Sequence, residues 1–153
     1  MSTIYNNATT NYSLHELIPH REPMLLLNSV CELGDSFSTA EITISSSSSF
    51  FMPEKGVPSW IGIEYMGQAA ALIAGYQLQQ GAVTPHLGLL LGTRKYEALT
   101  AWFKEGDVLL VSTKEIAVVG QELATFQCDI RNKNDGALYA TAKLSVFRKP
   151  LTN

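Results

Sequence analysis

Charge is scarce in this sequence. Charged residues make up 16% of the chain, whereas about 25% is usual in a globular domain. No run of lysine and arginine exceeds two residues, and the net charge is −3. A nucleic-acid binder needs a concentrated basic surface that displaces counterions from phosphates, so we expect no nucleic-acid partner. The scarcity favours an apolar surface covered by another subunit, although a small and rather neutral monomer has the same composition.

Cysteine and long apolar runs are also sparse. Cys31 and Cys128 lie in strand-like segments without the CxxC spacing of metal or redox sites, so we expect free thiols and no metal. No stretch approaches the ~18 apolar residues of a membrane-spanning helix, so we expect no membrane span. Residues 1–11 are polar and lack an apolar signal core, and a cytoplasmic location follows as the expectation.

Two motifs of common enzyme classes are missing. The sequence has no glycine-rich phosphate loop and no GxSxG nucleophile motif. We therefore expect no cofactor and no serine hydrolase triad.

The 153 residues suit one domain, since single domains commonly have about 100–200 residues. Residues 1–12 are polar and are expected to form a loose arm. Ser13 and Glu16 have the spacing of a capping box, which predicts a short helical turn ending before Pro19. The apolar run Met24 to Val30 is either a strand or a helical turn entering a strand.

One long helix and several strands account for the rest of the chain. Ser59 to Gly81 is apolar nearly all round, which predicts a buried helix with Ser59 as N-cap and Gly81 as its stop. Alternation predicts a strand over Phe37 to Ser45, and further strands are expected over 86–97, 107–118, 122–132 and 136–148. An antiparallel sheet wrapped around one central helix satisfies this order, so the predicted class is α+β.

The helix carries an unusual pair of polar residues, Glu64 and Gln68, which share one face at i, i+4 spacing. A buried carboxylate is costly unless it is paired or functional, so Glu64 is a candidate general acid or base. The alternative is a structural carboxylate that pairs with an arginine. Gly67, Ala71 and Gly75 recur every four residues and predict a smooth stripe that another backbone can approach closely.

Histidine is the other candidate proton carrier. His20 lies between Pro19 and Pro23 in a rigid polar loop, which favours a functional role. His15 on the short helix is expected to be solvated, and His86 to be a turn residue at the start of a strand.

Three segments resemble the FabZ-type 3-hydroxyacyl-ACP dehydratases. Residues 17–27, LIPHREPMLLL, are similar to the family's LPHRxPFLLVD signature, and residues 57–70 are similar to its MPGVLIVEALAQAAG helix. Residues 103–107, FKEGD, resemble its PVxPGD turn. The resemblance implies a hotdog fold over 1–153, and the closest subgroup is the dehydratase-like proteins of aryl polyene gene clusters.

The chain departs from that family at one position. The family's catalytic histidine stands in a GHFP loop fourteen residues before the helix carboxylate, and here that place holds Phe50. The carboxylate matches Glu64, and His20 is the substitute histidine that the PHR motif suggests. Two hypotheses follow: a rewired dehydratase that uses His20 and Glu64, or a subunit that has lost catalysis.

The resemblance implies a dehydration that converts a 3-hydroxyacyl thioester into a trans-2-enoyl thioester, in fatty acid or polyene biosynthesis. His20 would be the base and Glu64 the acid, contributed by different subunits. Predicted substrate contacts are Gln68, which also orients Glu64, and Tyr65, Phe50, Ser59 and Trp60. Backbone N–H groups of residues 59–62 would polarise the thioester carbonyl.

The expected partners are an acyl carrier protein and a second hotdog chain, in a homodimer or a heterodimer with another dehydratase. Two other functions remain open. One is a non-catalytic partner of a second, complete dehydratase, and the other is an acyl thioesterase that uses Glu64 to activate water.

Overall fold

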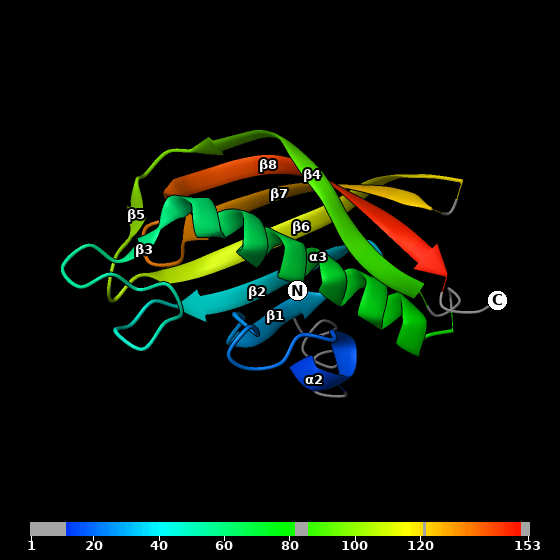
Figure 1. Ribbon diagram of the computed structural model, residues 1–153, viewed down its shortest axis with the longest axis horizontal. Coiled ribbons are helices and arrows are strands. Elements are labelled where there is room, and N and C mark those ends of the chain that lie inside the picture. Colours follow the sequence, from blue (N-terminus) through cyan, green and yellow to red (C-terminus); the bar gives the residue numbers. More distant parts are fainter. Residues whose placement is uncertain (1–11, 82–85, 121, 151–153) are drawn as a thin grey trace.

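The computed structural model describes residues 12–81, 86–120 and 122–150, without the side chains of 86–91, 94 and 150. A six-stranded antiparallel sheet curves around one long helix, α3 (Gly62–Gln79) (Figure 1). The strand order is β1-β2-β6-β7-β8-β4. The strands are β1 (Ser29–Leu33), β2 (Phe37–Thr43), β4 (His86–Ala98), β6 (Val108–Val119), β7 (Leu123–Asn132) and β8 (Leu138–Pro150). The predicted α+β arrangement is confirmed.

Alternation positions the strand side chains that pack on α3. In β2, the side chains of Ser38, Ala40 and Ile42 are buried, while Phe37, Thr39 and Glu41 are only partly buried. The hydroxyl of Ser38 donates to the Ala69 carbonyl of α3 at 2.7 Å and also contacts the Thr113 hydroxyl at 2.7 Å. Because these two hydrogen bonds satisfy the Ser38 hydroxyl, this polar group can occupy a position in the apolar core.

The start of the long helix differs from the prediction. A 3-10 turn, η1 (Ser59–Ile61), precedes α3, and Ser59 makes no side-chain cap. The Ser59 amide instead donates to the Ala101 carbonyl, because the chain here crosses the small ladder formed by β3 (Val57–Pro58) and β5 (Trp102–Phe103). The helix stop is confirmed, since Gly81 has φ +74°, a left-handed conformation that glycine adopts without strain.

The apolar run before β1 was predicted to be a strand or a helical turn. Residues 24–28 form neither. Pairing with β2 begins only at Ser29, opposite Glu41. The backbone groups of Met24 and Leu26 bond to the side chain of Gln68 on α3 instead of to a neighbouring strand. A helix side chain therefore takes the hydrogen bonds that a strand would have used.

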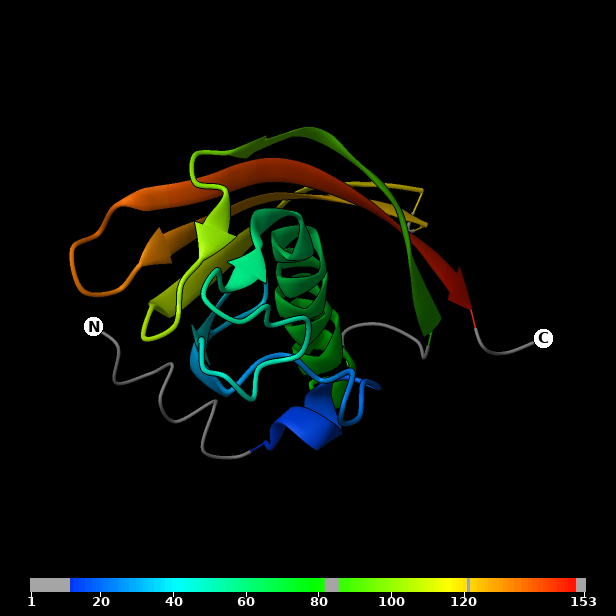
Figure 2. The ribbon, with the colours of Figure 1, turned by 60° about the vertical axis from the view of Figure 1, so that its left-hand side comes forward.

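The short helix α2 (Leu14–Leu17) packs against the second half of α3, on the side away from the sheet (Figure 2). Its predicted capping box is present, with Ser13 and Glu16 bonded reciprocally. The approach is closest at Gly75, where an added Cβ would lie 1.9 Å from the Leu17 carbonyl oxygen. The stripe of small residues was therefore correctly predicted to receive another backbone at this position.

Residues 1–12 were expected to form a loose arm. Residues 1–11 lie outside the described chain, but Tyr12 packs against α3, contrary to that expectation. Its ring meets Tyr76 edge-on at 6.5 Å, and its hydroxyl accepts from Gln80 at 3.2 Å. Both cysteines are free, as expected. Cys128 is buried, which raises the pKa of its thiol to about 12. In the described part of the chain, no helix is long and apolar enough to span a bilayer.

Candidate active site

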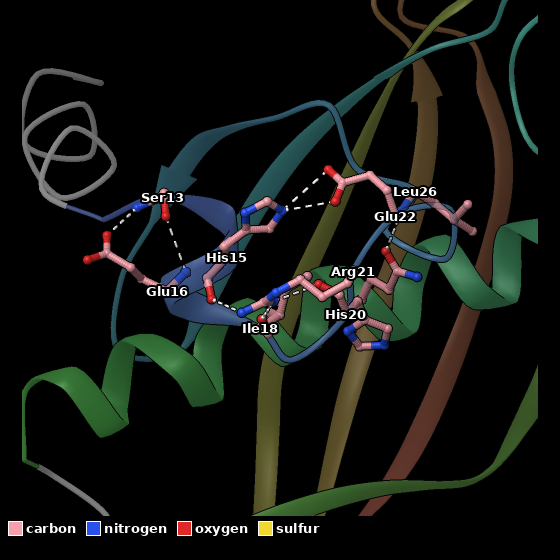
Figure 3. A network of polar contacts seen from close by, with 9 residues as sticks. Ser13, His15, Glu16, Ile18, His20, Arg21, Glu22 and Leu26 are labelled. Carbon is pink, nitrogen blue, oxygen red and sulfur yellow. Dashed lines mark hydrogen bonds and ion pairs between the residues drawn. The ribbon is translucent and has the colours of Figure 1, made fainter.

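The loop that carries His20 is held in shape by Arg21. The guanidinium donates to the carbonyls of Ile18 at 2.9 Å, His20 at 2.8 Å and His15 at 3.0 Å, and so closes the chain onto the end of α2 (Figure 3). His15 in turn pairs with Glu22 at 3.1 Å, so His15 is exposed as predicted but not unpaired. This network fixes the backbone on both sides of His20.

Gln68 joins that loop to α3. Its side chain is fully buried, at 0% exposure. The amide nitrogen donates to the Met24 carbonyl at 2.7 Å and to Glu64 Oε2 at 3.1 Å, while the amide oxygen accepts from the Leu26 amide at 2.9 Å. The predicted contact that orients Glu64 is thus present. Gln68 therefore links the loop to the helix through these hydrogen bonds, and we call this link the strut. The sequence resemblance did not indicate it.

His20 and Glu64 meet at this junction. The Nε2 atom of His20 lies 4.0 Å from Glu64 Oε2, and the two side chains are 29% and 42% exposed. At that separation the pair makes no direct hydrogen bond. The Nδ1 atom of His20 is buried and has no hydrogen-bond partner among the described residues.

Two predictions about this pair are wrong. Glu64 is not buried, because it stands in the first turn of α3 where its carboxylate opens to one side of the helix. The pair also does not need two subunits, since both residues belong to one chain. The physical reason is the strut. The hydrogen bonds of Gln68 hold the loop that carries His20 (residues 18–28, the PHR loop) against the first turns of α3 in the same chain.

The pair opens into a cavity of about 580 Å³ that follows α3. Small side chains of the helix form its floor, and α2 with the PHR loop forms one wall. Gly67 lies in the floor and has nothing within 4 Å of an added Cβ, so the stripe admits a backbone at Gly75 but leaves open space at Gly67. The described lining comprises residues 15–21, Glu64, Gly67, Ala70, Ala71, Ala74, Gly75, Leu78, Phe126, Val146 and Arg148.

The predicted substrate contacts lie elsewhere in this chain. Tyr65 is buried against Phe103, with ring centroids 5.8 Å apart, and lines a smaller cavity of about 270 Å³; burial raises the pKa of its hydroxyl. Trp60 is 61% exposed. Phe50 is 50% exposed at φ +69°. None of Gln68, Phe50, Ser59 and Trp60 lines the large cavity, and substrate contact by these residues stays a prediction.

The backbone donors expected to polarise the thioester are partly occupied. The Ser59 amide donates to the Ala101 carbonyl, and the Gly62 amide donates to the carbonyls of Ser59 and Trp60. The Ser59 carbonyl also accepts a short hydrogen bond from Tyr96, whose pKa burial raises to about 12. Ser59 and Gly62 are therefore not free to bind a carbonyl oxygen.

Sequence reasoning missed Arg148 in the cavity wall. The sequence does contain a signal for its burial. Ala140, Ala142, Leu144 and Arg148 occupy alternate positions of β8, which face the same side of the sheet, and all four are buried. A cation on an apolar strand face is unusual unless it is paired. As for metals, the described residues contain no group of three or more His, Cys, Asp or Glu that could hold an ion.

The strut gives a first prediction. Replacing Gln68 by leucine leaves the Met24 carbonyl and the Leu26 amide without partners, and each buried unsatisfied group costs about 1–3 kcal/mol. We expect Gln68→Leu to lower the free energy of unfolding by about 2–6 kcal/mol in urea titrations. Gln79→Leu, at an exposed position of the same helix, is the control and should stay within about 0.5 kcal/mol. Equal stability of the two variants would contradict the strut.

Comparisons with known proteins agree with this architecture. The ApeP-like family, described as ApeP dehydratase, matches residues 12–153. Among curated proteins, none matches the sequence significantly. A chain of the dehydratase heterocomplex ApeI:P from Xenorhabdus doucetiae superposes with a TM-score of 0.80 at 23% identity, covering 92% of this chain and 93% of that one.

Two further solved structures share the same architecture. A thioesterase from Haemophilus influenzae has a TM-score of 0.70 at 12% identity, with 93% and 94% of the two chains covered. The PaaI protein of the Escherichia coli phenylacetic acid degradation operon has a TM-score of 0.61 at 13% identity, with 78% and 81% covered. At such identities the similarity establishes the fold, which is the predicted hotdog.

Proposed function

Because the chain belongs to the ApeP-like dehydratase family, we propose that it removes water from a 3-hydroxyacyl group carried as a thioester on an acyl carrier protein, giving a trans-2-enoyl thioester. The observation that carries the proposal is the placement of His20 and Glu64, 4.0 Å apart, beside a cavity of about 580 Å³. A base and an acid that can both reach one substrate segment are what an elimination of water requires.

The proposed reaction uses the pair as follows. Neutral His20 takes a proton from C2 of the acyl chain through Nε2. The C2–C3 double bond forms as the C3–O bond breaks, and protonated Glu64 gives its proton to the departing hydroxyl, which leaves as water. The imidazolium then returns its proton to the Glu64 carboxylate. Because Nε2 and Oε2 lie 4.0 Å apart, this transfer requires one bridging water or a closer approach of the two side chains. No redox change and no cofactor are involved.

A non-catalytic subunit is the second candidate. Phe50 replaces the histidine that the dehydratase resemblance places before the helix, and its ring is 50% exposed. The similar Xenorhabdus doucetiae chain is part of a heterocomplex. We therefore propose that this chain assembles with a second hotdog dehydratase, and a location in the cytoplasm fits such a biosynthetic role.

One experiment separates these functions. The chain is purified alone and also together with a second hotdog dehydratase, and each sample is given a 3-hydroxyacyl carrier protein. We expect enoyl product from the chain alone, detected by mass spectrometry of the carrier arm. Product from the mixture only would establish the partner role, while release of free carrier thiol without enoyl product would establish a thioesterase.

A further inference from the structure

The His20 ring is not held in place by hydrogen bonds of its own. Its Nδ1 atom is buried and has no partner among the described residues, and its Nε2 atom lies 4.0 Å from Glu64. A general base must stand within hydrogen-bond reach of the proton that it takes, and a misplacement of about 1 Å can cost about 10²-fold in rate. The position of the ring therefore depends on the backbone that carries it.

Pro19 leaves a gap in the hydrogen bonds of that backbone. In α2 the Leu14 carbonyl accepts from the Ile18 amide, four residues further on. The next carbonyl, that of His15, would need an amide hydrogen on residue 19, which proline lacks. The end of the short helix thus has an acceptor that the following backbone cannot satisfy.

The Arg21 guanidinium supplies the missing donor. Its Nη2 atom donates to the His15 carbonyl at 3.0 Å, and its Nη1 atom donates to the carbonyls of Ile18 at 2.9 Å and of His20 at 2.8 Å (Figure 3). On the other side, the Arg21 carbonyl accepts from the Met24 amide at 2.8 Å and closes the loop. One planar side chain therefore joins the end of α2 to the residue that carries the imidazole.

Arg21 differs from the other arginines whose side chains the structure describes. Arg148 is 7% exposed and forms a short ion pair with Glu115 of β6, while Arg131 donates at 3.1 Å to a carbonyl in the exposed connection of β7 and β8. Arg21 is exposed and has no carboxylate within ion-pair distance in the described part of the chain. Two of its three hydrogen bonds are exposed, and water can satisfy these carbonyls when the guanidinium is absent. They therefore contribute more to the position of the loop than to stability.

We propose that Arg21 is a positioning residue, which sets the place of His20 relative to Glu64 and transmits to it the packing of α2 on α3. The inference rests on the proposed function. The Leu17 carbonyl meets α3 at Gly75, where an added Cβ would lie 1.9 Å from its oxygen. The guanidinium carries that fixed position from α2 to the loop. Because the Arg21 side chain also lines the 580 Å³ cavity, the test must separate positioning from direct contact with the substrate.

The first test is Arg21→Lys, which keeps the charge but replaces two donor nitrogens in a rigid plane by one. With a 3-hydroxyacyl carrier protein we expect kcat to fall by about ten- to hundredfold while KM stays the same, and the thermal midpoint to fall by no more than about 2–4 °C. Arg131→Lys is the matched control, since it also removes an arginine from an exposed carbonyl, and it should retain full kcat. Wild-type kcat in Arg21→Lys, or a rise in KM alone, overturns the inference.

A double-mutant cycle tests the transmission from α2. Gly75→Ala displaces α2, and this displacement should reach His20 through an intact Arg21. We therefore expect the loss of kcat in the double variant, Arg21→Lys with Gly75→Ala, to be smaller than the product of the two single losses. Losses that multiply would show that the two positions act independently, and would overturn the transmission.

Nuclear magnetic resonance decides the inference without turnover. Relaxation of the His20 ring carbons reports the mobility of the imidazole, and His20→Gln assigns the signal. We expect a more mobile ring in Arg21→Lys and an unchanged one in Arg131→Lys; equal mobility in the two variants overturns the inference. If the wild type dehydrates no 3-hydroxyacyl carrier protein, alone or with a second hotdog chain, the dehydratase proposal fails, and the ring relaxation still decides the role of Arg21.

Discussion

Glu64→Gln should reduce dehydration of a 3-hydroxyacyl carrier protein by about 10²–10⁴-fold, the usual contribution of a general acid or base. The amide keeps the volume of the carboxyl and can still bond to Gln68, so the fold and its unfolding midpoint should not change. The measurement is turnover at saturating substrate, with Glu105→Gln as an exposed matched control that retains full activity.

His20→Ala should cause a loss of the same order, because the other partner of the proton transfer is then missing. The backbone of the PHR loop is held by Arg21 and Gln68, which the substitution leaves in place. If both variants turn over substrate as fast as the wild type, the assignment of the pair is wrong. The purified chain must be active for this comparison, so the variants are also assayed with a hotdog partner present.

Gly75→Ala should destabilise the protein although alanine is the better helix former. The new Cβ would lie 1.9 Å from the Leu17 carbonyl oxygen and 2.7 Å from its carbon, and backbone atoms cannot rotate away as a flexible side chain can. Overpacking of this kind costs about 1–3 kcal/mol, and the gain in helix propensity offsets at most about 1 kcal/mol of it. Displacing α2 should also move the His20 loop and lower turnover.

Gly67→Ala is the matched control on the same helix. Nothing lies within 4 Å of its added Cβ, so helix propensity alone acts and should stabilise the protein by about 0.5–1 kcal/mol. Chemical denaturation of the two variants checks the prediction. A shift of the same sign in both would show that α2 does not pack on Gly75 as described.

The strands were predictable from the sequence because alternation reports directly on which face meets the helix. The connection between β7 and β8 has a signal of its own, since Asp135-Gly136 is a pair typical of hairpin turns, and Gly136 has φ +75°. The two-residue strands β3 and β5 were not predictable, because periodicity needs more residues than they contain. Their pairing also explains why Ser59 does not cap the helix.

Within the site, Glu64 and Gln68 were found by their contrast with an apolar helix, and His20 by its rigid loop. Their arrangement was not predictable, because it depends on two long-range hydrogen bonds between Gln68 and the backbone of Met24 and Leu26, which leave no local pattern. Arg148 and Glu115 had a usable signal, since both stand at positions whose neighbours of the same parity, such as Leu144 and Thr113, are buried. The substrate contacts proposed for Tyr65, Phe50, Ser59 and Trp60 remain predictions.

The order of strands in the sheet also has a kinetic meaning. β6, β7 and β8 are neighbours in sequence and in the sheet, and only a few residues separate one strand from the next, so they can pair by closing short loops. β2 must find β6, and β4 must find β8, across long intervening segments, and such non-local pairings slow folding. We therefore expect the antiparallel strands β6, β7 and β8 to form first. The segment that carries His20 precedes β1, which lies at the edge of the sheet, so His20 should meet Glu64 among the last events of folding.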